Sequence, residues 1–270
     1  MASYAQAKAS GGEWLLRIED LDPPREVPGS AARIEADLLR LGMRSDRPVL
    51  YQGARTADYR NALQELLERD QAYWCGCSRA DLPASGVYPG TCRNGLRGGK
   101  RRRAARLKVA PEPLRFTDLV QGECTESLAQ TVGDFVIWRA DGLPAYQLAV
   151  VVDDAFQHIT EVVRGADLLP STGRQIHLQR CLGLSTPSYA HLPVALGEDG
   201  HKLSKRLSSD PIRTTSPARS LQAALRFLGQ PCPSGLGLDG TWRWALDNWS
   251  LSRVPRRLEI PLRKEPAPAA

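Results

Sequence analysis

Residues 14–25 have the sequence WLLRIEDLDPPR. The first five residues alternate in the manner of a β-strand, and a cluster of carboxylates follows at residues 19–22. Two prolines then impose an irregular connection, after which apolar residues recur at helical spacing in residues 31–41 and 59–67. A strand that ends in polar residues and leads into helices is typical of an α/β domain with a mainly parallel sheet. In such domains, ligand contacts lie at the carboxyl ends of the strands.

The composition excludes several classes of protein. Of the 270 residues, 42% are hydrophobic and 24% are charged, as in an ordinary folded protein and unlike a disordered chain. The best candidate for a membrane span, residues 143–152, is too short to cross a bilayer, and residues 1–12 lack the apolar core of a secretory signal. We therefore expect a cytoplasmic protein with no membrane partner. The net charge of +6 permits a nucleic-acid partner without requiring one.

The remaining pattern predicts alternating strands and helices. Residues 1–10 have helical character, and residues 75–127 are rich in Gly, Pro and Arg with short β-like pieces. Two further segments read as buried strands, residues 134–138 and 147–152. We expect a helix at 171–182, a strand at 191–196, and helices at 219–228 and 241–249.

Three of the six cysteines lie close together in the chain, at Cys75, Cys77 and Cys92. In a reducing compartment such a group suggests a metal site, and zinc prefers four ligands in a tetrahedron with thiolates among them. The fourth ligand is open at this point: Tyr88, Asp81 and water are all candidates. The spacing also fits three ordinary buried cysteines.

Two basic segments could contact phosphates. Lys202 and Lys205 lie in the sequence KLSKR after a glycine-rich turn, where two lysines three residues apart can hold a triphosphate and neutralise a leaving pyrophosphate. Residues 97–108 form a second basic run, without an aromatic side chain to stack on bases. For each segment the alternative is a solvated basic loop.

Two charged residues are candidates for binding a small ligand. Glu19 follows the first predicted strand and could bind an ammonium group, although a surface acidic turn is the alternative. Arg164 ends an apolar stretch and precedes a glycine, which suits a bidentate clamp on a carboxylate. A structural ion pair of Arg164 with Asp153 or Asp154, at the end of the predicted strand 147–152, explains the same pattern.

Taken in order, these segments resemble one family, the glutamyl-Q tRNA(Asp) synthetases, which are short relatives of the class I glutamyl-tRNA synthetases. The resemblance covers residues 4–252 and rests on the sequences RIEDLDPPR at 17–25, DGL at 141–143, LAVVVDD at 148–154, VRGAD at 163–167 and KLSK at 202–205, together with the cysteine set and Tyr146. It implies a cytoplasmic, monomeric ligase that activates glutamate with ATP and Mg²⁺. The glutamyl group then passes to queuosine in the anticodon of tRNA(Asp).

The resemblance also implies roles for individual residues. Glu19 contacts the ammonium group of glutamate, Tyr146 and Arg164 line the glutamate pocket, and Arg164 suits the side-chain carboxylate. Lys205 belongs to a mobile loop that binds ATP, with Lys202 beside it as a catalytic lysine. One structural zinc ion is expected on a set of four ligands: Cys75, Cys77, Tyr88 and Cys92.

The implied fold is an α/β class I synthetase catalytic domain of Rossmann-like type with a zinc-containing insert. Residues 1–74 and 128–206 form its two parts, residues 75–127 the insert, residues 207–253 a short helical element and residues 254–270 a disordered tail. Only 64 residues follow Arg206, which leaves no room for an anticodon-binding domain.

The beginning of the chain departs from the family pattern. Residues 2–8 resemble the second half of the family's first helix, so the first strand and a HIGH-like ATP motif, about 25 residues by the layout of this βα unit, are expected to be absent. We expect the true start to lie upstream of Met1. The alternative is a non-catalytic tRNA-binding remnant of the synthetase fold. A third interpretation is a fragment of a tRNA-charging glutamyl-tRNA synthetase.

Overall fold

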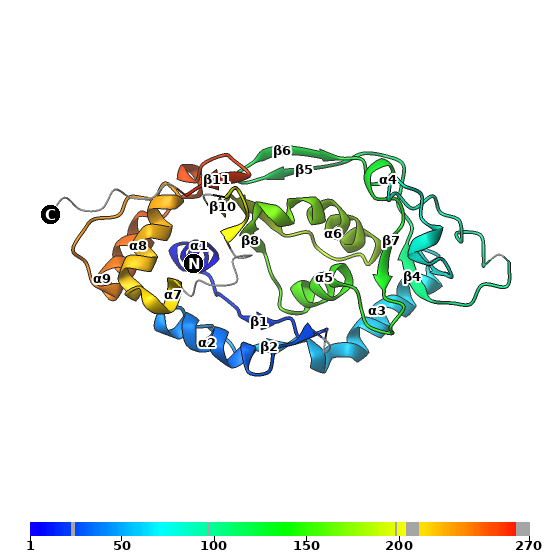
Figure 1. Cartoon of the computed structure of the whole chain (residues 1–270), viewed down its shortest axis with the longest axis horizontal. Helices are drawn as coiled ribbons and strands as arrows, with labels where there is room; N and C mark the ends of the chain where they lie inside the picture. Colours follow the sequence, from blue (N-terminus) through cyan, green and yellow to red (C-terminus); the bar gives the residue numbers. More distant parts are fainter. Residues whose placement is uncertain (23–24, 97, 198, 204–210, 263–270) are drawn as a thin grey trace.

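The computed structural model describes residues 1–22, 25–96, 98–197, 199–203 and 211–262. Figure 1 shows α5 and α6 in the middle of the molecule, α8 and α9 at one end, and β4 and β7 towards the other. Within the described residues the helices are α1 (Ala2–Ala9), α2 (Ser30–Arg40), α3 (Thr56–Glu68), α4 (Leu128–Thr131), α5 (Tyr146–Phe156), α6 (Leu169–Cys181), α7 (Pro211–Thr214), α8 (Pro217–Phe227) and α9 (Leu238–Asn248). Short 3₁₀ turns are η2 (Gln52–Arg55), η3 (Arg79–Asp81), η4 (Ala166–Leu168) and η6 (Leu251–Arg253).

The strands form small sheets of mixed direction. They are β1 (Arg17–Ile18), β2 (Leu50–Tyr51), β3 (Ala72–Cys75), β4 (Ala104–Leu107), β5 (Leu114–Asp118), β6 (Gly122–Glu126), β7 (Phe135–Trp138), β8 (Glu161–Gly165), β9 (Ser188–Leu192), β10 (Val194–Leu196) and β11 (Glu259–Pro261). The largest sheet has the order β6-β5-β9-β8, and β3-β4-β7 forms an antiparallel sheet. In the largest sheet β8 and β9 run parallel, with Arg164 directly beside His191. The expectation of a mainly parallel sheet therefore holds only for part of the strands.

Most predicted elements are confirmed with small shifts at their ends. The strand expected from residue 14 is limited to β1, because only Arg17 and Ile18 pair with β2. The strand expected at 191–196 divides into β9 and β10 at Pro193, whose nitrogen has no hydrogen to donate to a ladder.

The strand predicted at residues 147–152 is wrong, because this segment lies within helix α5. A run of apolar residues does not by itself distinguish a buried strand from a buried helix. Helix α5 is buried almost all round, since it packs against α3, α6 and β7. It therefore needs apolar residues on every side and lacks the one-sided pattern of a surface helix.

Residues 75–127 are joined to the rest of the fold by strand pairing on both sides. Strand β4 pairs with β3 and β7, and β5 pairs with β9. At the other end of the chain, the disordered tail expected from residue 254 is wrong for residues 254–262. Val254 is buried in an apolar cluster, and β11 pairs in parallel with β10. Residues 263–270 lie outside the described residues.

The main core lies between α3, α5, α6 and the β3-β4-β7 sheet, and one buried carboxylate links its parts. Asp153 is completely buried and accepts hydrogen bonds from Gln52 Nε2 at 2.8 Å, Arg55 Nε at 2.7 Å and the Tyr59 hydroxyl at 2.7 Å. These contacts satisfy the charge and join α5 to η2 and α3. Among the described helices, none is long and apolar enough to cross a bilayer.

We predict that Asp153→Ala lowers the free energy of unfolding by about 3–5 kcal/mol, because it leaves Gln52, Tyr59 and Arg55 without the buried carboxylate that accepts their hydrogen bonds. Urea denaturation followed by circular dichroism measures this. Glu65→Ala is the matched control, since it removes an ion pair with Arg69 in which both side chains are largely exposed. A loss in the control as large as that in Asp153→Ala would contradict a special role for the buried network.

Candidate active site

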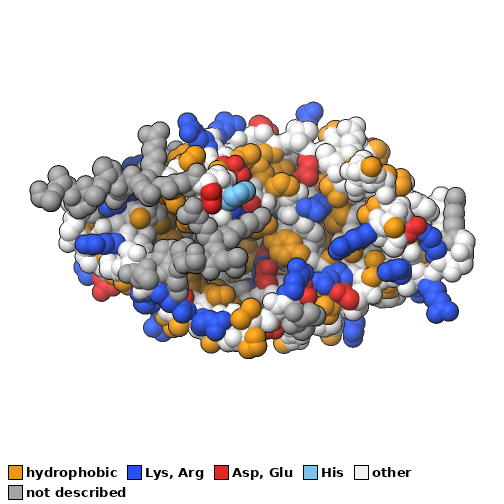
Figure 2. Space-filling model, in the orientation of Figure 1, with side chains coloured by type: hydrophobic (Ala, Val, Ile, Leu, Met, Phe, Trp, Pro, Cys, Tyr) orange, Lys and Arg blue, Asp and Glu red, His pale blue; other side chains and the backbone are white. Residues whose placement is uncertain are grey.

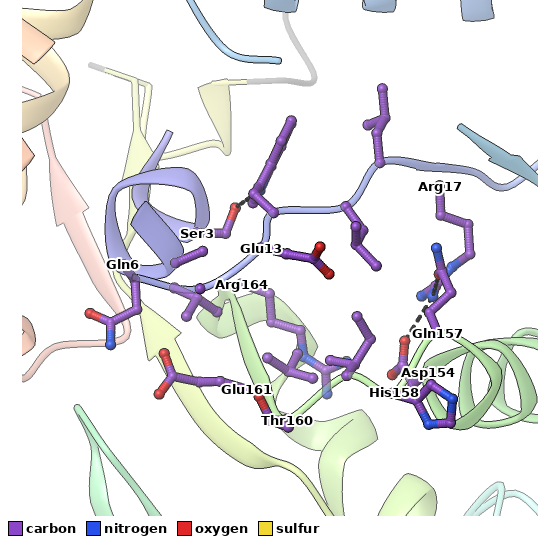
Figure 3. A pocket seen from close by; sticks show the side chains of 18 of the residues that line it. Ser3, Gln6, Glu13, Arg17, Asp154, Gln157, His158, Thr160, Glu161 and Arg164 are labelled. Atoms are coloured by element: carbon purple, nitrogen blue, oxygen red, sulfur yellow. Dashed lines mark hydrogen bonds and ion pairs between the residues drawn. The ribbon is translucent and has the colours of Figure 1, made fainter. Parts of the chain in front are cut away.

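A cavity of about 700 Å³ opens between α1, the segment leading into β1, α5 and β8. Glu19, Tyr146 and Arg164 all line it, so the structure brings together the three residues that the sequence assigns to a ligand pocket. They come from three separate elements: the end of β1, the first turn of α5 and the strand β8. Figure 3 shows Arg164 entering the cavity from β8, with Arg17 and Asp154 at another side.

Arg17 attaches the β1 segment to α5. Its Nη1 donates to Asp154 Oδ1 at 2.8 Å and to Gln157 Oε1 at 2.9 Å, and its Nη2 lies 3.8 Å from Glu19 Oε1. Asp153 and Asp154 thus pair with Arg55 and Arg17. The alternative in which these aspartates pair with Arg164 is therefore wrong.

Glu19 presents a carboxylate whose proton affinity is increased. Burial raises the pKa of Glu19, and Arg17 opposes this only in part. Asp154 behaves in the same way: burial raises its pKa against the lowering effect of Arg17. The Asp154 side chain is 11% exposed and the Glu19 side chain is 43% exposed, so Asp154 is the less solvated of the two. A cationic group in the cavity would stabilise the ionised form of either carboxylate.

Tyr146 and Arg164 supply hydrogen-bond donors on the other side of the cavity. Burial, followed by the nearby Glu19, raises the pKa of Tyr146, so its hydroxyl keeps its proton. Arg164 Nε donates to His191 Nε2 at 3.1 Å, and its Nη2 donates to Thr172 Oγ1 at 2.9 Å. No hydrogen bond from Nη1 to another described residue is found, so this nitrogen can serve a ligand.

The lysine segment is only partly described. Lys202 Nζ lies 2.5 Å from Asp167 Oδ2, and both side chains are on the surface outside the lining of the cavity. Lys205 lies outside the described residues, and its predicted role in binding ATP stays a prediction.

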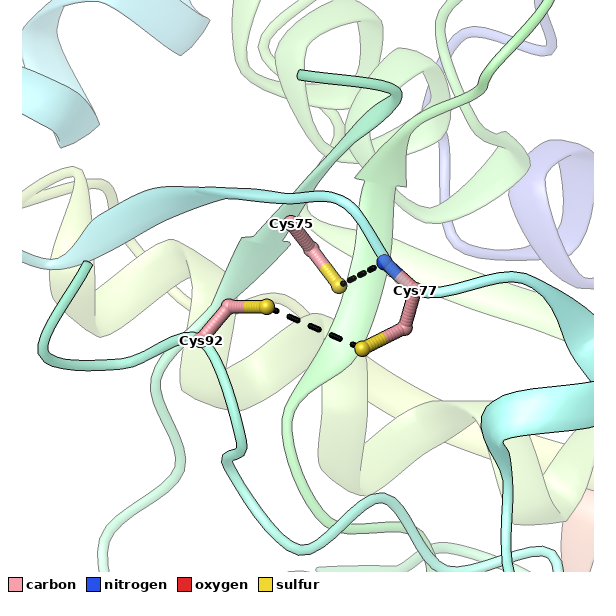
Figure 4. Close-up of side chains that lie close together, drawn as sticks. All are labelled: Cys75, Cys77 and Cys92. Carbon is pink, nitrogen blue, oxygen red and sulfur yellow. Dashed lines mark hydrogen bonds between the residues drawn. The ribbon is translucent and has the colours of Figure 1, made fainter. Parts of the chain in front are cut away.

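The three clustered cysteines lie together at the far end of the β3-β4-β7 sheet. Their sulfur atoms are all within 4.8 Å of one another, and Figure 4 shows them facing a common point. The separation of 3.7 Å between the Cys77 and Cys92 sulfurs matches the edge of about 3.8 Å expected for a tetrahedron with Zn–S bonds of about 2.3 Å. The cysteine geometry therefore fits a zinc ion.

The Tyr88 hydroxyl oxygen lies beside these sulfur atoms. It lies 3.3 Å from the Cys75 sulfur and 3.7 Å from the Cys77 sulfur. Asp81 instead accepts hydrogen bonds from Ser78 and from Lys100.

The turn between Cys75 and Cys77 contains Gly76, which passes so close to residue 100 that a Cβ would lie 2.7 Å from the Lys100 Cβ. The turn that brings Cys75 and Cys77 to one point thus depends on glycine.

Sequence reasoning missed several residues of the site. Arg17 belongs to the motif at residues 17–25, but the motif does not predict its bond to Asp154. The available signal is its position two residues before Glu19, on the same side of a strand. His191 and Thr172 carried no signal, because only the β8–β9 register and the packing of α6 bring them to Arg164.

The catalytic-domain family described as tRNA synthetases class I (E and Q) matches residues 1–85 and 93–216. The chain belongs to this family. It is accordingly a ligase of the class I aminoacyl-tRNA synthetase type, as the sequence resemblance predicts.

Relatives and solved structures support this assignment. The chain is 50% identical to a glutamyl-Q tRNA(Asp) synthetase of Chromobacterium violaceum, with 97% of this chain and 91% of the relative covered. It is 49% identical to a protein of the same name from Aromatoleum aromaticum, with coverages of 96% and 85%. The glutamate-tRNA synthetase of Elizabethkingia anophelis has a similar structure, with a TM-score of 0.78 and 26% identity over 97% of this chain. This chain spans 64% of the length of that synthetase. The α/β class I catalytic fold is thus confirmed.

We predict that Glu19 takes up a proton at a higher pH than an ordinary glutamate does, because burial raises its pKa. Asp118 is the internal reference: burial would raise its pKa, but hydrogen bonds from His191 and from backbone N–H groups outweigh this and lower it. Carboxyl ¹³C chemical shifts followed across a pH titration measure both groups. A Glu19 pKa at or below the ordinary value would show that the carboxylate is well solvated.

Proposed function

We propose that this chain uses ATP to activate glutamate and transfers the glutamyl group to queuosine in the anticodon of tRNA(Asp). The observation that carries the proposal is the presence of the Glu19 carboxylate and the Arg164 guanidinium in one cavity. Glutamate carries an ammonium group at one end and a side-chain carboxylate at the other, so its charges complement this pair. The names of the relatives that are about 50% identical support the same amino acid and the same tRNA.

Each lining residue has a distinct task in binding glutamate. Glu19 receives the ammonium group, whose positive charge stabilises the ionised carboxylate. Arg164 offers Nη1 to the side-chain carboxylate, and the Tyr146 hydroxyl donates a further hydrogen bond. The α-carboxylate is then left to react. A solved glutamate tRNA ligase from Elizabethkingia meningosepticum, bound to its amino acid, is similar to this chain with a TM-score of 0.76.

Activation joins the α-carboxylate of glutamate to the α-phosphate of ATP. A carboxylate oxygen attacks the phosphorus, and the bond from that phosphorus to the pyrophosphate oxygen breaks. Lys202 and Lys205 neutralise the charge that develops on the pyrophosphate. For this, Lys202 exchanges its contact with Asp167 for one with ATP. Mg²⁺, when bound with ATP, screens the phosphate charges.

A structural zinc ion on Cys75, Cys77, Tyr88 and Cys92 completes the proposal. The ion supplies a cross-link that fixes residues 75–92 at the end of the β3-β4-β7 sheet. Arg106 places its guanidinium carbon 3.8 Å from the centre of the Tyr88 ring and keeps that ring in place. Monomeric state and cytoplasmic location stay predictions.

We predict glutamate-dependent exchange of labelled pyrophosphate into ATP without tRNA, followed by transfer of labelled glutamate to tRNA(Asp) that carries queuosine. Arg164→Ala is expected to lower kcat/KM for glutamate in the exchange on the order of 100-fold, because a charge-assisted hydrogen bond from Nη1 and the positive charge of the pocket are lost. Arg60→Ala, an exposed arginine on α3, is the matched control and is expected to keep normal exchange.

Other outcomes of this assay point to the other interpretations. Glutamate attached at the 3′ end of a tRNA would identify a tRNA-charging synthetase. Tight binding of tRNA(Asp) by a folded protein without any exchange would identify a non-catalytic binding protein. Equal transfer to tRNA(Asp) with and without queuosine would remove queuosine from the proposal.

We predict that zinc removal acts on stability. Cys92→Ser, or treatment with a strong chelator, is expected to lower the melting temperature on the order of 10 °C and to release one zinc ion per chain, measured by mass spectrometry of the metal. Cys124→Ser lies outside the cluster and serves as the control. An unmodified protein that binds no zinc when zinc is supplied, together with an unchanged melting temperature in Cys92→Ser, would refute the zinc site.

A further inference from the structure

A buried chain of hydrogen bonds lies behind Arg164, on the side away from the cavity. The parallel pairing of β8 with β9 places Arg164 beside His191, and Arg164 Nε donates to His191 Nε2 at 3.1 Å. On the other side of the ring, His191 Nδ1 lies 2.6 Å from Asp118 Oδ2. His191 is completely buried and Asp118 is 1% exposed.

Asp118 is itself held rigidly. Its Oδ1 accepts backbone N–H groups of Val120 at 3.0 Å, Gln121 at 2.8 Å and His191 at 3.1 Å. Its Oδ2 is thereby directed at the imidazole. Three backbone donors and the ring satisfy the ionised carboxylate, and no lysine or arginine among the described residues forms a salt bridge with it. The imidazole is thus positioned by a carboxylate that backbone N–H groups hold in place, and not by a mobile side chain.

The donors around the ring determine where its single proton lies. Arginine Nε always carries hydrogen and cannot accept, so His191 Nε2 must present its lone pair to Arg164. The Thr172 hydroxyl lies 3.1 Å from the same nitrogen and accepts from Arg164 Nη2. The ring proton is then on Nδ1, where it is donated to the Asp118 carboxylate.

We propose that His191, oriented by Asp118, is a positioning residue that directs Arg164 into the cavity. Two of the three guanidinium nitrogens are fixed, Nε by His191 and Nη2 by Thr172, which leaves Nη1 for the ligand. A guanidinium fixed in this way loses little side-chain freedom when it binds a carboxylate. The inference rests on the proposed function, because it assigns the carboxylate to glutamate.

Asp118→Asn tests the hydrogen-bond chain at the residue that orients His191, and it changes the side-chain volume little. The amide oxygen can still accept the backbone N–H groups, but the amide NH₂ would face His191 Nδ1. The ring proton then moves to Nε2 and meets the Nε hydrogen of Arg164. We expect the KM for glutamate in pyrophosphate exchange to rise about 10- to 100-fold, with kcat within about threefold and the KM for ATP unchanged. Equal loss of kcat and no change in KM would overturn the proposal.

Variants at position 191 keep the test decisive if Asp118→Asn folds poorly. His191→Gln retains an oxygen that can accept from Arg164 and is expected to keep most of the glutamate affinity, whereas His191→Leu is expected to lose it. Identical KM values in these two variants would overturn the proposal. His177→Gln is the matched control, because His177 is a half-buried histidine that bonds the Lys108 carbonyl oxygen, away from the cavity. It is expected to leave both constants unchanged.

The tautomer provides a readout that does not depend on activity. In the ¹⁵N-labelled protein, long-range ¹H–¹⁵N correlations are expected to show His191 protonated at Nδ1, and at Nε2 in Asp118→Asn. Protonation at Nε2 in the unmodified chain would refute the link to Arg164. If the unmodified chain shows the Nδ1 tautomer but no glutamate-dependent exchange, the proposed function fails while the geometry of the positioning chain is upheld.

Discussion

The ion pair between Arg17 and Asp154 fixes the segment that carries Glu19. Strand β1 consists of two residues and pairs only with the equally short β2, so its ladder gives it little support of its own. The bond from Arg17 to α5 supplies what the ladder lacks, and the neighbouring Asp153 ties α5 in turn to η2 and α3. Arg17 and Asp154 are largely buried at the edge of the cavity, so breaking the pair would leave poorly solvated charges and is costly. The position of the Glu19 carboxylate thus depends on two adjacent aspartates of one buried helix.

Two oppositely charged side chains line the cavity, and contacts with the protein hold both of them in position before a ligand binds. Glu19 is anchored through its neighbour Arg17, and Arg164 through His191 and Thr172, so the protein holds both charges in place by contacts outside the cavity. Such preorganisation lowers the cost of binding, because side chains that are already ordered lose little freedom. It also explains why polar groups are buried around a site that is itself open to solvent.

The resemblance to the family assigns residues in compact motifs to one pocket, whereas the sequence does not indicate the residues that support them. Glu19, Tyr146 and Arg164 were predicted as one pocket and do line one cavity. Their partners were not predicted, since Asp118 and His191 are 73 residues apart and meet only through strand register. The error at α5 has a related cause: a helix buried on all sides loses the periodicity by which a helix is recognised.

The parallel pairing of β10 with β11 has a consequence for how the molecule folds. The segment that contains Lys202 begins directly after β10, and the partner of that strand is supplied by residues 259–261. Parallel pairing across so large a separation in the chain requires a long loop to close before any hydrogen bond is gained. The base of the lysine segment therefore depends on residues 259–261 and cannot take its final form before they have paired with β10.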